Sequence, residues 1–326
     1  DPDRALANVA TFLANVGART SYLHLLHENR AVARLLVRLF ASSEFLSRFF
    51  LQHPELLEAL VRVDLIRVRP SESDQARELA DRLASAGDLE SELDVLRRFR
   101  HEEFLRIGIH DLEGSLDGVE VEGQLSDLAT VCLAAAVRIA RRDICRRTGV
   151  PDVAGTDGLA VIAMGKLGGG ELNYHSDLDI VFVWDVPEGA SWPGPLDPHD
   201  FHTRVAQRTI SVLQTQTSEG QAYKIDTRLR PSGNQGTLVT SVTAFEDYHR
   251  ASAAVWERQA LIKGRVVAGP PALAGRIDEA VASFVYGRSL DAAEAVEIGR
   301  IRERMAHERG QEQSIKTGAG GVVDVE

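Results

Sequence analysis

The chain contains few residues of several types, and each shortage excludes a class of protein. Only two cysteines, Cys132 and Cys145, occur among its 326 residues, and they do not form a Cys-x-x-Cys pair. This usage excludes a disulfide framework and a cysteine-based zinc site, and it is typical of a reducing compartment. The first residues, DPDRALANVA, also lack the basic and apolar regions of a signal peptide. We therefore expect a cytoplasmic protein.

Positive charge is scarce as well, because 37 Lys and Arg residues stand against 48 Asp and Glu residues, which gives a net charge of −11. Nucleic-acid binding usually shows as a basic patch or a high isoelectric point, so we expect no nucleic-acid partner. No run approaches the roughly 18 apolar residues of a membrane span, so we expect no membrane partner. The chain has no initiator Met and stops abruptly at GGVVDVE, so we expect a fragment of a longer protein.

Three regions of the chain differ in their hydrophobic pattern. Residues 1–150 repeat apolar side chains at three- and four-residue steps, as in SDLATVCLAAAVRIARR, which predicts one helix after another. Within them, the acidic stretch 113–123 is expected to be a connection. Residues 151–270 mix strand and helix patterns, and residues 271–326 return to a helical pattern. The fold class predicted is α+β, with three domains at these boundaries.

The middle region is expected to form a small mixed sheet. The wholly apolar runs at 159–164 and 179–184 are typical of strands buried on both faces. Two further strands are predicted at 221–230 and 236–241, and the segment 201–217 has the pattern of a helix.

Two acids stand directly before the second apolar run, and a glycine cluster precedes them. Because side chains alternate between the faces of a strand, Asp177 and Asp179 should lie on one face, and Leu178 and Ile180 on the other. Burial of such acids without a partner would be costly. This placement therefore indicates a function for the pair, and the alternative is a solvated turn at the start of the strand.

The same alternation predicts a second charged strand in YKIDTRLR. Lys224, Asp226, Arg228 and Arg230 should share one face, so that three carboxylates and three cations meet. Divalent cations would remove the repulsion between the carboxylates, and Mg²⁺ prefers carboxylates together with substrate phosphates. Two such ions can hold the attacking and leaving oxygens of a phosphoryl displacement. The alternative is structural: Asp226 forms an ion pair with Arg228 or Arg230.

The glycine cluster matches neither a Walker A loop nor a dinucleotide-binding fingerprint. Glycine in a turn still lets backbone N–H groups approach phosphate oxygens, and the two arginines offer forked donors. The sequence therefore indicates a nucleotide site. Asp324 and Glu326, near the end of the chain, could form a second acidic pair, and the alternative is a plain turn and helix start.

Long motifs in the chain resemble a known family. The chain resembles the polymerase-β-type nucleotidyltransferases in the order of its motifs. A glycine pair is followed by an acid–x–acid at a strand and by a third acid on a later strand. A closer similarity is to glutamine synthetase adenylyltransferase, also called glutamate–ammonia ligase adenylyltransferase. It is carried by the segments GKLGGGELNYHSDLDIVFVW, YKIDTRLRPSGNQGTLVTS, AFEDYH, WERQALIKGRVV and KTGAGGVVDVE. The earlier SYLHLLHENRAVARLLVRLF and HPELLEAL resemble the segment before the second catalytic domain of that family.

The resemblance implies a polymerase-β-like core between helical regions, with ATP as substrate and two Mg²⁺ ions as cofactors. By the same resemblance, Asp177, Asp179 and Asp226 would be the catalytic metal ligands. Nucleotide binding would fall to the residues next to the phosphates, namely Gly168, Gly169, Ser176, Arg228 and Arg230. Glutamine synthetase would be the protein substrate, and the family leaves room for a nitrogen-signalling regulatory protein as a further partner.

The family carries two activities on related domains, and this chain has room for one. RLRPSG and ERQAL resemble the domain that attaches AMP to a tyrosine of glutamine synthetase, whereas Glu257-Arg258 also resembles the domain that removes it. A catalytically silent docking module is the alternative from another class. Because all three acids are present, the sequence favours an active adenylyltransferase.

Overall fold

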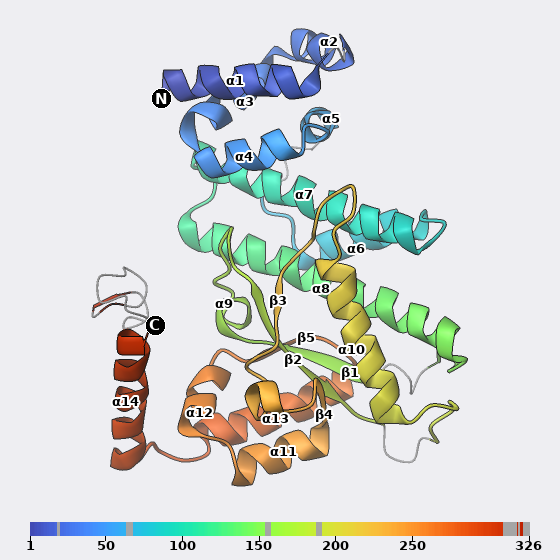
Figure 1. The fold of residues 1–326 in the computed structure, drawn as a ribbon, viewed down its shortest axis with the longest axis vertical. Coiled ribbons are helices and arrows are strands. Elements are labelled where there is room, and N and C mark those ends of the chain that lie inside the picture. Colours follow the sequence, from blue (N-terminus) through green and yellow to red (C-terminus); the bar gives the residue numbers. More distant parts are fainter. Residues whose placement is uncertain are drawn as a thin grey trace.

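In the computed structural model, helices surround a small mixed sheet, which confirms the α+β class (Figure 1). The structure describes residues 1–17, 20–62, 68–153, 158–186 and 191–308, together with residues 318, 320 and 321. Asp324 and Glu326, the predicted second acidic pair, lie outside the described residues.

Helices occupy the N-terminal part of the chain, as its periodicity predicts. They are α1 (Pro2–Val16), α2 (Thr20–Glu28), α3 (Arg30–Ser42), α4 (Glu44–Gln52), α5 (Leu56–Arg62), α6 (Glu72–Ala84), α7 (Leu89–Glu113) and α8 (Gly118–Thr148). The predicted connection at 113–123 was too long, because α8 begins at Gly118. The Asp117 carboxylate accepts from the backbone N–H of Glu120, and the Glu120 carboxylate accepts from that of Asp117. This capping box starts the helix inside the acidic stretch.

Helix α8 corrects the expectation about membrane spans. By length and composition alone, Gly118–Thr148 is long and apolar enough to cross a membrane. However, 78% of its most apolar window is buried inside the protein, where α8 packs against α6, α7 and α10. A core helix passes the same test, so the observation is weak support for a membrane span.

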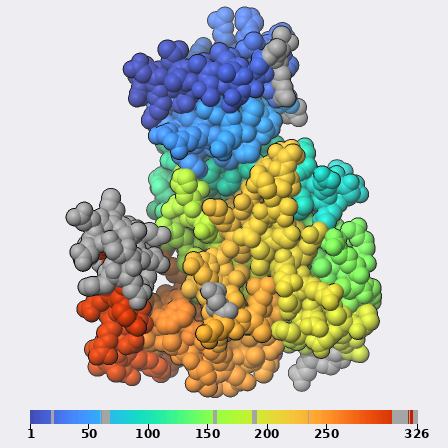
Figure 2. Space-filling model, viewed as in Figure 1, coloured from blue at the N-terminus to red at the C-terminus, as the bar shows by residue number. Residues whose placement is uncertain are grey.

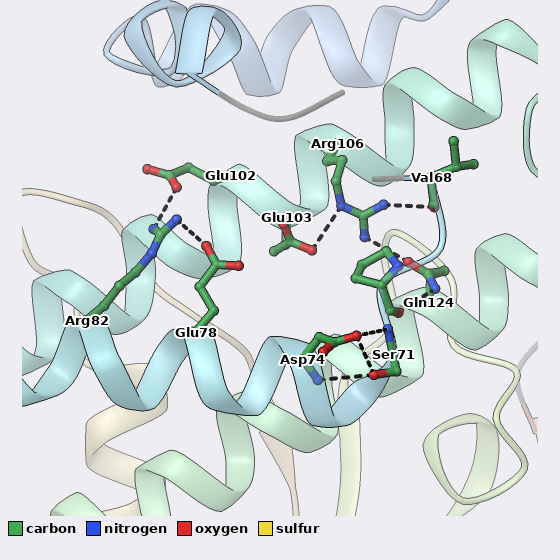
Figure 3. Close-up of polar contacts among 10 residues, drawn as sticks. Val68, Ser71, Asp74, Glu78, Arg82, Glu102, Glu103, Arg106 and Gln124 are labelled. Atoms are coloured by element: carbon green, nitrogen blue, oxygen red, sulfur yellow. Dashed lines mark hydrogen bonds and ion pairs between the residues drawn. The ribbon is translucent and has the colours of Figure 1, made fainter. Parts of the chain in front are cut away.

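A buried arginine joins α7 to α8 and to the segment before α6 (Figure 3). Arg106 donates to the carboxylate of Glu103 at 3.0 Å, to the carbonyl oxygen of Val68 at 3.1 Å and to the side-chain oxygen of Gln124 at 2.7 Å. Arg106 is only 2% exposed. A buried guanidinium is costly unless its donors are satisfied. Glu103 satisfies one donor within α7, and Val68 and Gln124 link α7 to the segment before α6 and to α8.

Within the described residues, five strands form one sheet in the order β3-β2-β1-β5, and β4 also pairs with β2. The strands are β1 (Leu159–Ala163), β2 (Leu178–Trp184), β3 (Ile225–Asp226), β4 (Val239–Ser241) and β5 (Arg265–Ala268). β1 runs antiparallel to β2 and β5, whereas β3 and β4 run parallel to β2. The remaining helices are α9 (Gly165–Gly168), α10 (Pro198–Gln214), α11 (Val242–Ala251), α12 (Val255–Leu261), α13 (Pro271–Tyr286) and α14 (Ala292–Glu308).

The two apolar runs are buried on both faces, as predicted. Ile180 and Phe182 of β2 belong to a cluster shared with α8 and α10, whereas Val181 and Val183 belong to a second cluster shared with α11, α12 and α13. The sheet therefore lies between two helical layers (Figure 1). The first cluster continues into the N-terminal helices, and the predicted domain boundaries stay a prediction.

The strand predicted at 221–230 is much shorter than expected. It ends at Asp226, because that carboxylate accepts from the backbone N–H of Arg228 at 2.9 Å and so starts a turn. Further turn bonds follow, from the N–H of Arg230 to Thr227 and from that of Gly233 to Arg230. The predicted alternation of Arg228 and Arg230 along a strand is therefore wrong.

Arg97 ties the helical region to the end of α10. Its side chain is fully buried. The guanidinium donates to the carbonyl oxygens of Val212 and Gly220, at 3.1 and 2.8 Å, and to that of Thr215. These carbonyls include unpaired acceptors at a helix C-terminus, which a buried cation satisfies well.

Replacing Arg97 with methionine should lower the free energy of unfolding by about 3 kcal/mol, because three backbone acceptors, one of them buried, lose a fully buried donor. Chemical denaturation monitored by circular dichroism measures this change. Arg98→Met is the matched control, because Arg98 is half exposed and pairs with Glu219 at 3.2 Å. It should cost at most about 1 kcal/mol. Equal effects of the two substitutions would contradict the role of Arg97.

Candidate active site

The sheet brings two of the three predicted acids side by side. In the parallel pairing of β2 with β3, Asp179 lies opposite Asp226. Both side chains are half-buried, and Asp177 is exposed one residue before β2 begins. Opposite positions on neighbouring strands point to the same face, so these carboxylates share one edge of the site.

The face on which the acids lie follows from the packing of β2. Asp179 alternates with Leu178 and Ile180, which are buried in the cluster with α8 and α10. It therefore lies on the face of Val181 and Val183, toward the layer of α11 to α13. For Asp179, the alternation predicted from the sequence is confirmed. The shared face of Asp177 stays a prediction, because Asp177 precedes β2.

Arg228 neutralises the third acid. Its Nε donates to both carboxylate oxygens of Asp226, at 3.0 and 2.8 Å, and its Nη2 donates to Oδ2. The hydrogen bonds from Arg228 hold the pKa of Asp226 below its ordinary value, against the opposing effect of burial. The ion pair considered as an alternative is therefore formed, and Asp226 is ionised at neutral pH.

The other two predicted cations lie apart from this pair. Arg230 donates to the carbonyl oxygens of Thr227 at 2.8 Å and Gly236 at 3.3 Å, and thereby closes the loop after β3. Lys224 is exposed, and its carbonyl oxygen accepts from the N–H of Leu178 at the start of the β2–β3 pairing.

The predicted glycines have backbone roles in α9. The N–H of Gly168 donates to Met164 and that of Gly169 donates to Gly165, at 3.0 and 3.1 Å. A Cβ at Gly168 would lie 1.9 Å from the carbonyl oxygen of Lys263, so only glycine fits there. In this conformation both N–H groups are used within the turn.

The glycine nearest to the acids is one that the sequence analysis did not assign to the site. Gly165 has a φ of +53°, and a Cβ there would lie 2.9 Å from Oδ2 of Asp179. Its backbone therefore makes a close approach to the carboxylate. Its position directly after the apolar run 159–164 was the signal that would have identified it.

The loop before Asp177 is fixed by Ser176 and by the helices above it. The Ser176 hydroxyl donates to the side-chain oxygen of Asn173 at 2.8 Å and accepts from its N–H. Tyr174 donates to Asp111 of α7 at 2.8 Å, and the ring of His175 lies 4.1 Å from that of Phe45 on α4. The sequence analysis missed these contacts, which connect distant segments.

A cavity of about 980 Å³ opens beside Asp179. Its walls come from β2, the loop after β3, α12 and α14. Figure 2 shows α14, in red, along the side of the orange surface formed by the preceding segments. Such a volume is within the range of sites for nucleotide-sized ligands. The lining residues are Asp179, Leu229, Ala254, Val255, Trp256, Gln259, Ala260, Glu297, Ile301 and Arg304.

The acids suit a divalent cation in chemistry but are not assembled into a metal cluster. In the part of the chain that the structure describes, no three His, Cys, Asp or Glu side chains are grouped closely enough to hold a metal ion. However, the pKa of Arg228 is raised chiefly by Asp226 and further by the charges of Asp179 and Asp177. The three carboxylates therefore stabilise positive charge at one place, where the guanidinium now stands. Carboxylate oxygens are also the ligands that Mg²⁺ prefers.

Replacing Arg228 with methionine should raise the pKa of Asp226 toward its ordinary value, which an NMR titration of the carboxyl carbon measures. Because the folded-state pKa is lowered, this pair stabilises the protein above the ordinary pKa of 3.8 and ceases to do so as the pH falls through the lowered value. Arg230→Met is the control, because Arg230 has the smallest of the effects on Asp226. A larger shift in the control would contradict the assignment.

A known protein family matches most of the chain. The model of the family described as GlnE, glutamate-ammonia ligase adenylyltransferase, matches residues 33–280, which is more than half of the chain. The match includes all three acids and α12. The chain therefore belongs to the glutamate–ammonia ligase adenylyltransferase family, as a nucleotidyltransferase domain of enzymes that act on glutamine synthetase.

Proposed function

We propose that this domain transfers AMP from ATP to a tyrosine of glutamine synthetase, and that it does so in the cytoplasm. The observation that carries the proposal is the pairing of Asp179 with Asp226 at the edge of a nucleotide-sized cavity. A silent docking module would have no need of three carboxylates at such an edge, because they repel one another when no cation compensates them.

In the proposed reaction, the tyrosine oxygen forms a bond to the α-phosphorus while the bond from that phosphorus to the bridging oxygen breaks. Pyrophosphate leaves with the bonding electron pair. Asp226 is ionised at neutral pH and accepts the phenolic proton. Two Mg²⁺ ions, held by Asp177, Asp179 and Asp226, would supply charge neutralisation at the phosphates.

Arg228 has two positions in this proposal. Beside Asp226 it keeps the carboxylates compatible with one another in the unliganded protein. With the nucleotide bound, its exposed guanidinium turns to the phosphates, for which it is a forked donor. Ser176 fixes the loop before Asp177 through Asn173, and the N–H groups of Gly168 and Gly169 close the turn after β1.

The direction of transfer rests on two motifs that touch in the structure. Ser232 has a φ of +60°, and its N–H donates to the hydroxyl of Tyr248 at 3.2 Å. That hydroxyl lies 2.9 Å from the Glu257 carboxylate. RLRPSG and ERQAL, the segments that resemble the attaching domain, are thus joined through one tyrosine. The proposed direction is attachment, because RLRPSG and ERQAL resemble the attaching domain. Removal of AMP by phosphate is the alternative, because Glu257-Arg258 also resembles the removing domain.

Asp177→Asn and Asp179→Asn should each lower AMP transfer at least about 100-fold, because each removes a charge at the reacting phosphate. Thermal stability should not fall, because the substitution also removes repulsion. Asp247→Asn is the control, since Asp247 is an exposed acid that pairs with Arg250 on α11. Transfer by Asp179→Asn at a rate near that of the wild type would refute the site.

The two directions give different products. With ATP and unmodified glutamine synthetase, the attaching activity should yield pyrophosphate and a tyrosine carrying AMP. Mass spectrometry of the peptide detects the modification. With modified glutamine synthetase and phosphate, the removing activity would yield ADP instead. Detection of ADP formation alone would overturn the proposed direction while leaving the site intact.

A further inference from the structure

Helix α12 presents two faces of different character. Glu257 and Arg258 are buried, and Arg258 donates to the carbonyl oxygen of Val285 at 3.0 and 2.8 Å. Trp256 and Gln259, three positions apart, line the cavity beside Asp179. Residues at this spacing lie on the same face of a helix. The buried pair therefore anchors α12, while the opposite face is presented to the cavity.

We propose that Trp256 and Gln259 form the base subsite of the nucleotide, with Trp256 as the stacking surface and Gln259 as the group that selects adenine. The inference rests on the proposed function, because it assigns the other end of the same substrate. It goes beyond that function by naming the residues that read the base.

The residues that line the cavity differ between the end at Asp179, where the phosphates react, and the end at α12, where the base binds. Asp179 marks the wall where the phosphates react, and the remaining lining is largely apolar, with Leu229 and Ile301 on the loop and helix that face α12. A planar base is the part of a nucleotide that an apolar wall with an indole ring accommodates. The charged triphosphate would lose its hydration there, and the cation of the lining, Arg304, already pairs with Glu297 at 3.4 Å.

Gln259 distinguishes adenine from guanine. Its side-chain amide carries a donor and an acceptor next to each other, which match the ring nitrogen and the amino group of adenine. Guanine presents two acceptors at the corresponding edge, so one of them would face the amide oxygen. Gln259 is exposed within the cavity, so it can be replaced without disturbing the packing of α12.

The anchoring of α12 makes this subsite rigid before the nucleotide binds. The Glu257 carboxylate accepts from the N–H of Ala254 at the start of the helix and from Tyr248. Arg258 fastens the same turn to the end of α13. A preformed stacking surface loses less conformational freedom on binding, which favours affinity.

Calorimetric titrations in the presence of Mg²⁺ test the inference, with ATP, GTP and tripolyphosphate as ligands. Trp256→Ala should weaken ATP binding roughly 5- to 150-fold, as expected for one lost base stack, and leave tripolyphosphate affinity unchanged. Trp256→Phe should restore most of the loss. Gln259→Leu should bring the affinities for ATP and GTP within about 3-fold of each other, because the match to adenine is lost.

The outcomes separate this inference from the proposed function. The base subsite is refuted if the wild-type protein binds tripolyphosphate and ATP equally well. It is also refuted if Trp256→Ala and Gln259→Leu both keep the wild-type affinity for ATP and the wild-type preference for ATP over GTP. If wild-type protein binds no ATP at all, the proposed function fails first. Gln259→Leu keeps the test decisive should Trp256→Ala unfold, which a melting curve reveals.

Discussion

The parallel pairing of β2 with β3 is the constraint on which the site depends, because it alone places Asp226 beside Asp179. β3 has only two residues, so its position is set by what precedes it. Tyr223 donates its N–H to Leu213 near the end of α10, and the buried Arg97 holds that end together with the turn before β3. The helical region thus determines where the third carboxylate lies.

The proposed metal site and the observed ion pair involve the same carboxylates. In each, a positive charge next to these carboxylates compensates their negative charge. Three carboxylates require positive charge nearby, and Arg228 provides it in the unliganded protein. The sequence analysis treated an ion pair and a catalytic role for Asp226 as alternatives. The structure permits both, because Arg228 is mostly exposed and a mobile guanidinium can exchange one anion for another.

The sequence predicted the features that follow from burial. β1 is wholly apolar, and β2 is apolar apart from Asp179, because helices cover both faces of the sheet. Alternation then placed Asp179 correctly. Alternation could not predict the length of β3. The strand ends because the Asp226 carboxylate accepts a hydrogen bond from the backbone N–H of Arg228, two residues further on. Gly165 and Trp256 were missed for a related reason: their roles depend on contacts with residues distant in sequence.

The loop from Glu171 to Ser176 is held at its middle by side chains of α4 and α7, through Tyr174 and His175. It leads directly into Asp177, so the position of this acid is linked to helices more than sixty residues earlier in the chain. A tilt of α4 against α7 would move the loop while leaving every strand in register. The N-terminal helices therefore help to position the loop that carries Asp177, and truncating them would remove these contacts.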